Sequence, residues 1–460
     1  MERLPDDVLL LTMEYLGPED LLTCRLVCKR LGRLALHPGV WSLQSWNANS
    51  VDGDRRACRV LRLAPRLGKL VARVGPHLSL AMARCAVKEL ELVANESTSV
   101  QATLLFRNQE KLGRLRRVEL YFYGEALGGA PVLFAALVSS PVLEKLEIRN
   151  VPFNFDAKAM HCTVRQPALK HFKCSAKAGS VPFVNFVLTV HATTLQVVDL
   201  GHEACCPTAT STVALLAGLP HLRELSCPLL PDMGALAASE TLGLLTLHVA
   251  AAMRPAAPAA AKYLRRARHL QNVTLRYRSA TRFPVDVGVD LVEALAWSCL
   301  NRVETLCIEH EYDPDANRAD GEDARLPDPG PLIRSLPSLT ALRTLRLDVF
   351  ETPGALLLAV TPDAAPALRA LYLNPSPRRM AGLPPCAHAW RHEDAVRAFL
   401  SANRSVGLHV AATPYCFKDE RCPACALGWL ACHGDLWPSW DWELTSASST
   451  LSHRRWVHVR

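Results

Sequence analysis

Twelve copies of a six-residue apolar pattern, spaced as LxxLxL, constrain the fold of this chain more than any other feature. Clear examples are VKELEL at 87–92, LRRVEL at 115–120 and LRTLRL at 342–347. Successive copies mostly begin 26 to 29 residues apart, which is a typical period for solenoids that stack one strand and one helix per repeat. The pattern therefore predicts a repeat array rather than a set of unrelated compact domains.

The segments between these copies predict the second half of each repeat. Helical apolar patterns lie at 133–138, 183–190, 213–219, 291–298 and 395–400. Strands that alternate with helices indicate an α/β fold with a parallel sheet and helices on its other side. Two wider gaps, 250–262 and 311–331, are rich in Pro and predict loops; the second is a passive insertion or, alternatively, a ligand-binding lid. The other nine copies begin at Cys58, Leu143, Leu169, Leu195, Leu222, Leu242, Leu270, Val303 and Leu368.

Composition and charge exclude several classes of protein. The chain has 460 residues, of which 49% are hydrophobic and 21% charged, which excludes a largely disordered protein. The net charge is only +8 and no block of basic residues is present, so nucleic-acid binding has no support. We find no signal peptide and no apolar run long enough to span a membrane. The 16 Cys are then expected to be mostly reduced, in a protein of the cytoplasm and/or nucleus.

The N-terminal forty residues predict three short helices. The first, LPDDVLLLTMEYL at 4–16, has Pro5 and two Asp at its start and Gly17 after its end, as helix termini favour. Its apolar side chains go almost all the way round, so burial on one side does not cover them. A unit this small cannot bury so much apolar surface internally. The apolar surface that stays uncovered predicts a partner protein.

The same segment, Leu4 to Trp41, resembles an F-box. It carries Leu-Pro at the start, Tyr-Leu at the end of the first helix, Asp-Leu-Leu in the second, Leu-Val-Cys-Lys-Arg, and a closing Pro-x-x-Trp. It departs from the family pattern at Thr12, Leu31 and Gly32. The alternative is a generic three-helix cap without a partner. The resemblance implies docking on a Skp-type adaptor, and through it on a cullin, by Leu4, Pro5, Val8, Leu9, Met13, Leu16, Leu22, Leu26 and Trp41.

The repeats resemble the leucine-rich repeats of F-box/LRR proteins, with their horseshoe-shaped, ribonuclease-inhibitor-like fold. The resemblance implies an N-terminal F-box at 1–45, a linker at 46–57, about 12 repeats at 58–410, and a Cys- and Trp-rich C-terminal cap at 411–460. It is loose in one respect, because the usual Asn after the strand is present only in places, such as Asn150 and Asn374.

Alternation along each strand predicts which residues face outward on the concave sheet. Outward aromatic and arginine side chains offer the largest contact energy per residue, and they gather in the late repeats. We therefore expect a target protein to bind at Arg276, Tyr277, Arg346 and Tyr372. The central outward row reads Glu91, Glu119, Glu147, Lys173, Asp199, Ser226, Thr246, Thr274, Cys307, Arg346 and Tyr372.

Four cysteines near the C-terminus form a candidate metal site. Cys422 and Cys425 have the two-residue spacing that lets both thiolates reach one tetrahedral zinc, and Cys416 with Cys432 or His433 completes a set of four. The other two spacings are not standard ones. Structural zinc is therefore the weaker expectation, against reduced cysteines that pack under a cap with tryptophans, and we expect no other cofactor.

No catalytic motif is present: the sequence has no GxSxG, no phosphate-binding loop, no Gly-rich dinucleotide fingerprint after a strand and no HExxH. We expect binding rather than catalysis. The two resemblances together imply a substrate receptor of an SCF-type ubiquitin ligase, with an unknown target on its repeats. One alternative is an F-box/LRR scaffold, structural or inhibitory, without ubiquitin transfer. Another is a zinc-dependent enzyme in the C-terminal tail.

Overall fold

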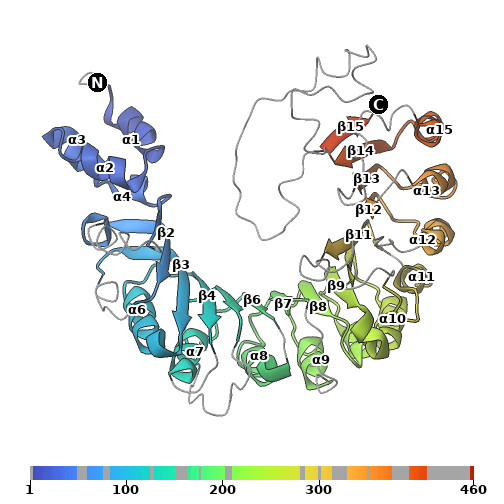
Figure 1. The fold of residues 1–460 in the computed structure, drawn as a ribbon, viewed down its shortest axis with the longest axis horizontal. Coiled ribbons are helices and arrows are strands. Elements are labelled where there is room, and N and C mark those ends of the chain that lie inside the picture. Colours follow the sequence, from blue (N-terminus) through green and yellow to red (C-terminus); the bar gives the residue numbers. More distant parts are fainter. Residues whose placement is uncertain are drawn as a thin grey trace, which may run out of the picture. The chain divides into compact units, whose positions relative to one another are not determined.

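The computed structural model describes the chain in two compact units, Met1–Ser226 and Cys227–Arg460. Within them it describes residues 4–48, 60–75, 83–124, 129–151, 164, 166–175, 178–202, 210–279, 285–298, 302–312, 329–349, 353–375, 393–411 and 456–459. In each unit the strands follow one another in sequence order, with helices on one side of them (Figure 1). No helix of the described residues is both long and apolar enough to cross a membrane.

The first unit begins with a helical head of four short helices rather than the three that the sequence predicted. Proline occupies the first turn of two of them, where its missing N–H costs nothing. The Trp41 ring is fully buried, and its indole N–H donates to the carbonyl of Ala35 at 2.6 Å. The helices are α1 (Asp6–Glu14), α2 (Pro18–Cys24), α3 (Lys29–Ala35) and α4 (Pro38–Trp41).

Eight parallel strands follow the head, with helices between most of them, and the last strand crosses the boundary between the two units. The strands are β1 (Ser45–Asn47), β2 (Arg66–Arg73), β3 (Ala86–Asn95), β4 (Arg117–Tyr123), β5 (Lys145–Arg149), β6 (His171–Cys174), β7 (Val197–Asp199) and β8 (Glu224–Pro228). The helices are η2 (Glu96–Thr98), α6 (Ser99–Lys111), α7 (Ala130–Val138), η4 (Ala178–Ser180), α8 (Val181–Val190) and α9 (Thr210–Ala217).

The second unit repeats this plan. Its strands β9 to β14 pair in parallel, and the last strand pairs with β14 in the antiparallel direction. The strands are β9 (Leu244–Ala250), β10 (Asn272–Ser279), β11 (Thr305–Tyr312), β12 (Thr344–Val349), β13 (Ala370–Pro375), β14 (Gly407–Ala411) and β15 (Trp456–Val459). The helices are η5 (Met233–Ala238), η6 (Ala251–Ala256), α10 (Ala257–Arg266), α11 (Leu291–Ala296), α12 (Gly330–Ser335), η7 (Leu336–Ser338), α13 (Gly354–Ala359) and α15 (Asp394–Ala402).

The LxxLxL pattern places the strands because its last two apolar positions fall on the side that the helices cover. Leu90 of β3, Val118 of β4 and Leu146 of β5 lie in register on that side, and all three are buried. The residue between those two positions points the other way. We call that other side of the strands the open face; among the described residues no helix covers it in either unit (Figure 1).

Two predictions of secondary structure were wrong. The copy at 58–63 is not a strand, because its described part, 60–63, is helical; the strand begins at Arg66, where Leu67, Leu70 and Ala72 supply the apolar side. The gap at 250–262 is not a loop but η6 and α10. Ala is the best helix former and Pro258 lies in the first turn of α10, where proline is tolerated. The second gap lies mostly outside the described residues.

Three strands were missed altogether. β1 lies at the start of the segment that was predicted to be a linker, and it pairs with β2. β14 lies beyond the last clear copy of the pattern, and β15 lies within the predicted cap.

His191 gives the first unit a pH-dependent stability. Its ring is buried and bonds the carbonyl of Val138 through Nε2 at 3.0 Å. Burial lowers the pKa of His191, so the unfolded chain takes up a proton at a higher pH than the folded one. The contribution is fully present above about pH 6.5, the unfolded value, and is lost as the pH falls below it, by at most about 1.4 kcal/mol per pH unit.

We therefore expect acidification from about pH 7 to about pH 5.5 to lower the free energy of unfolding less in His191→Gln than in the wild type. The glutamine amide still donates to Val138 but does not titrate. Urea unfolding at several pH values measures the difference. Parallel pH profiles in the two proteins would contradict this assignment.

Candidate interaction surfaces

Helix α1 has two apolar faces. Leu9 and Met13, four residues apart, point into the head and are 5% and 4% exposed. Val8, Leu11 and Tyr15 follow a spacing of three and four residues, which places them on one stripe of the helix. Leu11 is 59% and Tyr15 91% exposed. We call Leu4, Val8, Leu11 and Tyr15 the α1 stripe; it is apolar surface that the head itself does not cover.

A second apolar site lies in the turn after α2. Leu26 is 82% and Val27 67% exposed. The turn is fixed by backbone bonds, because the N–H of Leu26 donates to the carbonyl of Thr23 and that of Val27 to the carbonyl of Cys24. These two side chains are therefore held in water by an ordered backbone.

These exposures correct part of the predicted adaptor surface. Leu9, Met13 and Trp41 are core residues of the head, so they do not offer a contact surface to a partner. Substituting them would unfold the head instead of testing docking. Leu4, Pro5, Val8 and Leu26 are exposed, and Leu16 and Leu22 are partly exposed, as a docking role requires. Leu11, Tyr15 and Val27 are exposed as well, although the sequence did not indicate them as contact residues.

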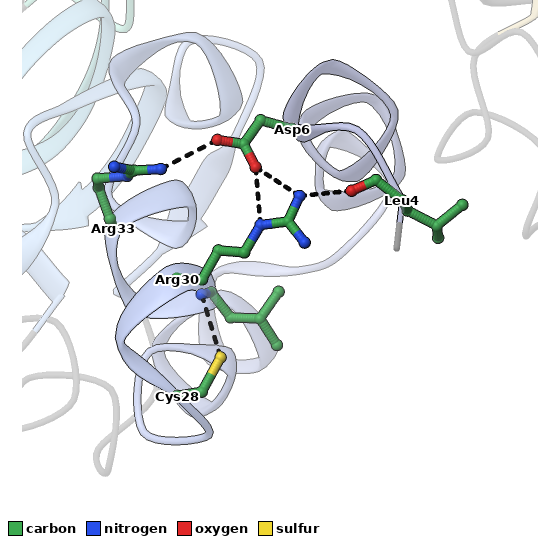
Figure 2. Close-up of polar contacts among 6 residues, drawn as sticks. Leu4, Asp6, Cys28, Arg30 and Arg33 are labelled. Atoms are coloured by element: carbon green, nitrogen blue, oxygen red, sulfur yellow. Dashed lines mark hydrogen bonds and ion pairs between the residues drawn. The ribbon is translucent and has the colours of Figure 1, made fainter. Parts of the chain in front are cut away.

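One carboxylate fixes the start of α1 against α3. Asp6 accepts hydrogen bonds from Nε of Arg30 at 2.8 Å and from Nη2 of Arg33 at 3.0 Å, and Nη2 of Arg30 also donates to the carbonyl of Leu4 (Figure 2). The hydrogen bond from Arg30 is the main reason why the pKa of Asp6 is lowered. Arg30 thus positions the Leu4 end of the α1 stripe.

The open face of the first unit carries charges of both signs that pair with one another. The predicted central row is confirmed, since Glu91, Glu119, Glu147, Lys173, Asp199 and Ser226 lie in register across β3 to β8. The paired atoms lie 2.8 Å apart in Lys69–Glu91, Arg117–Glu89 and Arg149–Glu119, 2.9 Å in Arg149–Glu147, 3.4 Å in Lys173–Glu147 and 3.6 Å in Lys173–Asp199. The acidic row that the sequence showed is therefore neutralised within the face.

Tyr121 also contacts this network of ion pairs. The guanidinium of Arg149 lies over its ring, 4.6 Å from the centroid. Burial raises the pKa of the Tyr121 hydroxyl, and a hydrogen bond to Glu119 adds to the effect. Arg149 therefore contacts one aromatic ring and pairs with two carboxylates, all within its own chain.

The open face of the second unit carries a row of stacked planar groups. Arg346, Tyr372 and His409 occupy the same register position on β12, β13 and β14. The guanidinium lies 4.8 Å from the centroid of the Tyr372 ring. The imidazole of His409 lies on the ring's other side, with centroids 4.5 Å apart and planes 13° apart. We call these three residues the stacked row.

The row next to the stacked row contains further polar side chains that pair across the strands. Arg276 on β10 donates through Nε to Glu309 on β11 at 2.7 Å. Asp348 on β12 accepts from the Asn374 amide and from the N–H of His310. Predicted target residues Arg276, Arg346 and Tyr372 thus lie on the open face.

Tyr277 does not lie with the other three predicted target residues. It shares its parity with Val273 and Leu275, so its ring points to the helix-covered side and is 8% exposed. Burial raises the pKa of its hydroxyl. The expectation that Tyr277 faces a target is corrected, because residues 276 and 277 of one strand cannot both point to the same side.

Two buried thiols of the described residues, Cys85 and Cys307, are not placed for chemistry. Burial raises the pKa of the Cys85 thiol to about 12, and burial together with Glu309 raises that of Cys307 on the open face, so both are protonated and unreactive at neutral pH. No group of three or more His, Cys, Asp or Glu within the described ranges could hold a metal ion. The candidate zinc ligands Cys416, Cys422, Cys425 and Cys432 lie outside those ranges, and the zinc site stays a prediction.

Comparison with known proteins identifies the head. Residues 1–43 match the F-box-like family. No curated protein matches the chain. One similar solved structure is the crystal structure of a TLR13–ssRNA13 complex, at 16% identity and a TM-score of 0.29, covering 72% of this chain and 48% of that one. This chain thus spans about half of that protein, and a TM-score so low adds nothing to the description of the fold.

The head and the repeats together show how the chain is organised. An F-box-like head is followed by strand–helix repeats with the parallel sheet of a leucine-rich-repeat solenoid. This is the domain arrangement of the F-box/LRR proteins that the sequence resembles. Both parts are typical protein-interaction modules, so the coarse function is protein binding.

Proposed function

We propose that this chain is a substrate receptor of an SCF-type ubiquitin ligase. The observation that carries the proposal is the α1 stripe on a head that matches the F-box-like family. Large exposed apolar side chains at fixed spacing indicate a surface that a partner covers. The partner we propose is a Skp-type adaptor, which joins the chain to a cullin scaffold.

The repeats supply the second half of this function. Their open face offers charged and aromatic side chains from successive strands to a target protein, as solenoids commonly do. The ligase then acts by proximity: the receptor raises the local concentration of a target lysine near an enzyme that the cullin carries. Such a receptor works in the cytoplasm or nucleus and does no bond chemistry of its own. Its target binds at Arg276, Arg346 and Tyr372.

The second candidate is an F-box/LRR scaffold that binds the adaptor without ubiquitin transfer. Affinity purification of the tagged chain from cells separates the two. A ligase subunit recovers the cullin together with the adaptor, whereas a scaffold recovers the adaptor alone. Recovery of neither would contradict both candidates. The zinc-dependent enzyme is tested by metal analysis of the wild type and Cys425→Ser, since only a zinc protein loses bound metal on this substitution.

A further inference from the structure

We infer that the C-terminal end of α10 and the turns beside it form a second interaction surface, which binds an acidic segment of a partner protein. This surface goes beyond the proposed function, because it lies on helices and turns of the second unit and not on the open face. It consists of five cations and one aromatic residue. We call these residues the α10 patch: Lys262, Arg265, Arg266, Arg268, Trp297 and Arg302.

Three cations of the α10 patch share one face of the helix. Lys262, Arg265 and Arg266 are spaced three and four residues apart, which places them on one stripe of α10. All three are exposed. The opposite side of the helix packs into the core, where Tyr263 and Leu264 are buried. The packing of α10 therefore fixes the direction in which its basic stripe points.

Trp297 lies beside the end of this stripe. It is the C-cap residue of α11, which lies next to α10 (Figure 1). The hydroxyl of Ser298 donates to the carbonyl of Ala267 at 3.3 Å, and so holds the end of α11 against the residue that precedes Arg268. The Trp297 side chain is 77% exposed. A large aromatic residue therefore stands in water next to the cations.

Arg268 and Arg302 belong to the turns that lead into β10 and β11. These two strands pair in parallel, with Asn272 opposite Thr305. Counting back along both strands from that pair sets Arg302 beside His269, the residue directly after Arg268. Both arginines are exposed. The α10 patch therefore continues from the helix to the adjacent edge of the sheet.

The cations of the α10 patch are not paired with carboxylates of the chain. Within the described part of the chain, none of the five makes an ion pair or a side-chain hydrogen bond. Two carboxylates lie at the same edge of the sheet. Glu304 pairs with Arg343 at 3.8 Å, and Glu240 lies level with Arg268 one strand earlier without pairing with it. Five cations against one unpaired carboxylate leave this surface positive.

Helix stability accounts for only part of this patch. Cations in the last turn of a helix stabilise the carbonyl end of its dipole, and Arg265 and Arg266 lie in that turn of α10. Arg268 and Arg302 lie outside helices, so the dipole does not explain them. It does not explain the exposed Trp297 either. A binding function accounts for all of these residues together.

The composition of the patch indicates the chemistry of the partner. Four of the five cations are Arg, whose planar fork fits a carboxylate with two N–H donors and is less strongly hydrated than the ammonium of Lys. Arg and Trp are also the side chains most enriched in the hot spots of protein interfaces. The patch therefore fits an acidic protein segment that also carries an apolar side chain for Trp297.

Two other anionic partners fit less well. An anionic membrane gains about the same energy from Lys as from Arg, so it gives no reason for the excess of Arg. A single-stranded nucleic acid stacks its bases on several aromatic side chains along its path, whereas the α10 patch has one.

The test uses the full chain and a fluorescent peptide of glutamates with interspersed leucines. A peptide of the same length with glutamine in place of glutamate is the neutral control. We expect only the glutamate peptide to bind, with an affinity that falls as salt rises. Arg265→Gln with Arg266→Gln should weaken binding at least tenfold, about 1.4 kcal/mol, and should reduce the salt dependence. Trp297→Ala should weaken binding without changing the salt dependence, because the ring carries no charge.

Lys88→Gln with Lys111→Gln is the charge-matched control. Both lysines are exposed cations of the first unit, and Lys111 lies in the last turn of α6 as the two arginines do in α10. This pair should change the affinity less than about twofold. Thermal unfolding of each variant shows that the fold is retained. If the helix pair unfolds, Arg268→Gln, which lies outside α10, replaces it and should also weaken binding.

Equal losses in the two double variants, equal binding of the two peptides, or no binding of the glutamate peptide would each overturn the inference. So would a chain that binds phosphatidylserine vesicles or an oligouridylate but not the glutamate peptide. Because neither adaptor nor cullin is present, the result is independent of whether the head docks on one.

Discussion

Replacing Leu11 and Tyr15 together with Glu is expected to lower the affinity for a Skp-type adaptor at least a hundredfold, about 2.7 kcal/mol. Both side chains point into water in the free chain, so the change leaves the core of the head intact. In the complex, two apolar contacts worth roughly 1.5–3 kcal/mol each would be lost, and two charges would lose water. Calorimetric titration with purified adaptor measures the change.

A matched control separates docking from general surface effects. Val132 on α7 is likewise an exposed apolar residue, 58% exposed, and it lies outside the head. Val132→Glu should leave adaptor affinity unchanged. If the double variant retained wild-type affinity and melting temperature, the α1 stripe would not be the docking surface.

The second large effect is expected at Phe134, which lies at the centre of a chain of buried rings. Its ring meets Phe122 of β4 edge-on, with centroids 5.7 Å apart, and Phe183 of α8 at 5.2 Å. Phe134→Ala removes both contacts and leaves a cavity, and should lower the free energy of unfolding of the first unit by about 3–5 kcal/mol. Urea unfolding measures the loss.

Val132→Ala on the same helix provides the control for this substitution. Its exposed side chain should contribute less than about 0.5 kcal/mol, so the two variants share a helix and differ in burial. A loss below about 1 kcal/mol in Phe134→Ala would show that the structure relaxes around the missing ring.

The repeat pattern was sufficient to predict most of the strands and the direction in which they face. A strand buried on one side has to present alternate residues to the helices, so the row from Glu91 to Ser226 followed from the sequence alone. The pattern was misleading at 58–63, where the apolar spacing also fits a helix. It also failed at β14, where only Leu408 and Val410 mark the strand.

The sequence was less able to predict which residues of the head contact a partner. Helix α1 is apolar on both of its faces, and apolar periodicity does not say which face the other helices of the head will cover. The buried Leu9 and Met13 were therefore predicted to contact the partner, and the exposed Leu11 and Tyr15 were not. The spacing of Leu4, Val8, Leu11 and Tyr15 is the signal that could have found the stripe, once the buried face was known.

The sequence pattern also could not predict which side chains pair across the strands. Glu119 and Glu147 suggested an acidic surface, but Arg149, from the row next to theirs, pairs with both. Tyr277 was misplaced for a simpler reason, since alternation from Val273 and Leu275 already puts it on the buried side.

The most direct test of the receptor function compares the proteins that co-purify from cells with the full-length wild-type chain and with its Leu11→Glu, Tyr15→Glu variant. Quantitative mass spectrometry should show the adaptor and the cullin lost together from the variant, while proteins held by the open face of the repeats remain. If the variant kept the adaptor and cullin, or if the wild type recovered neither, this chain would not be an SCF substrate receptor.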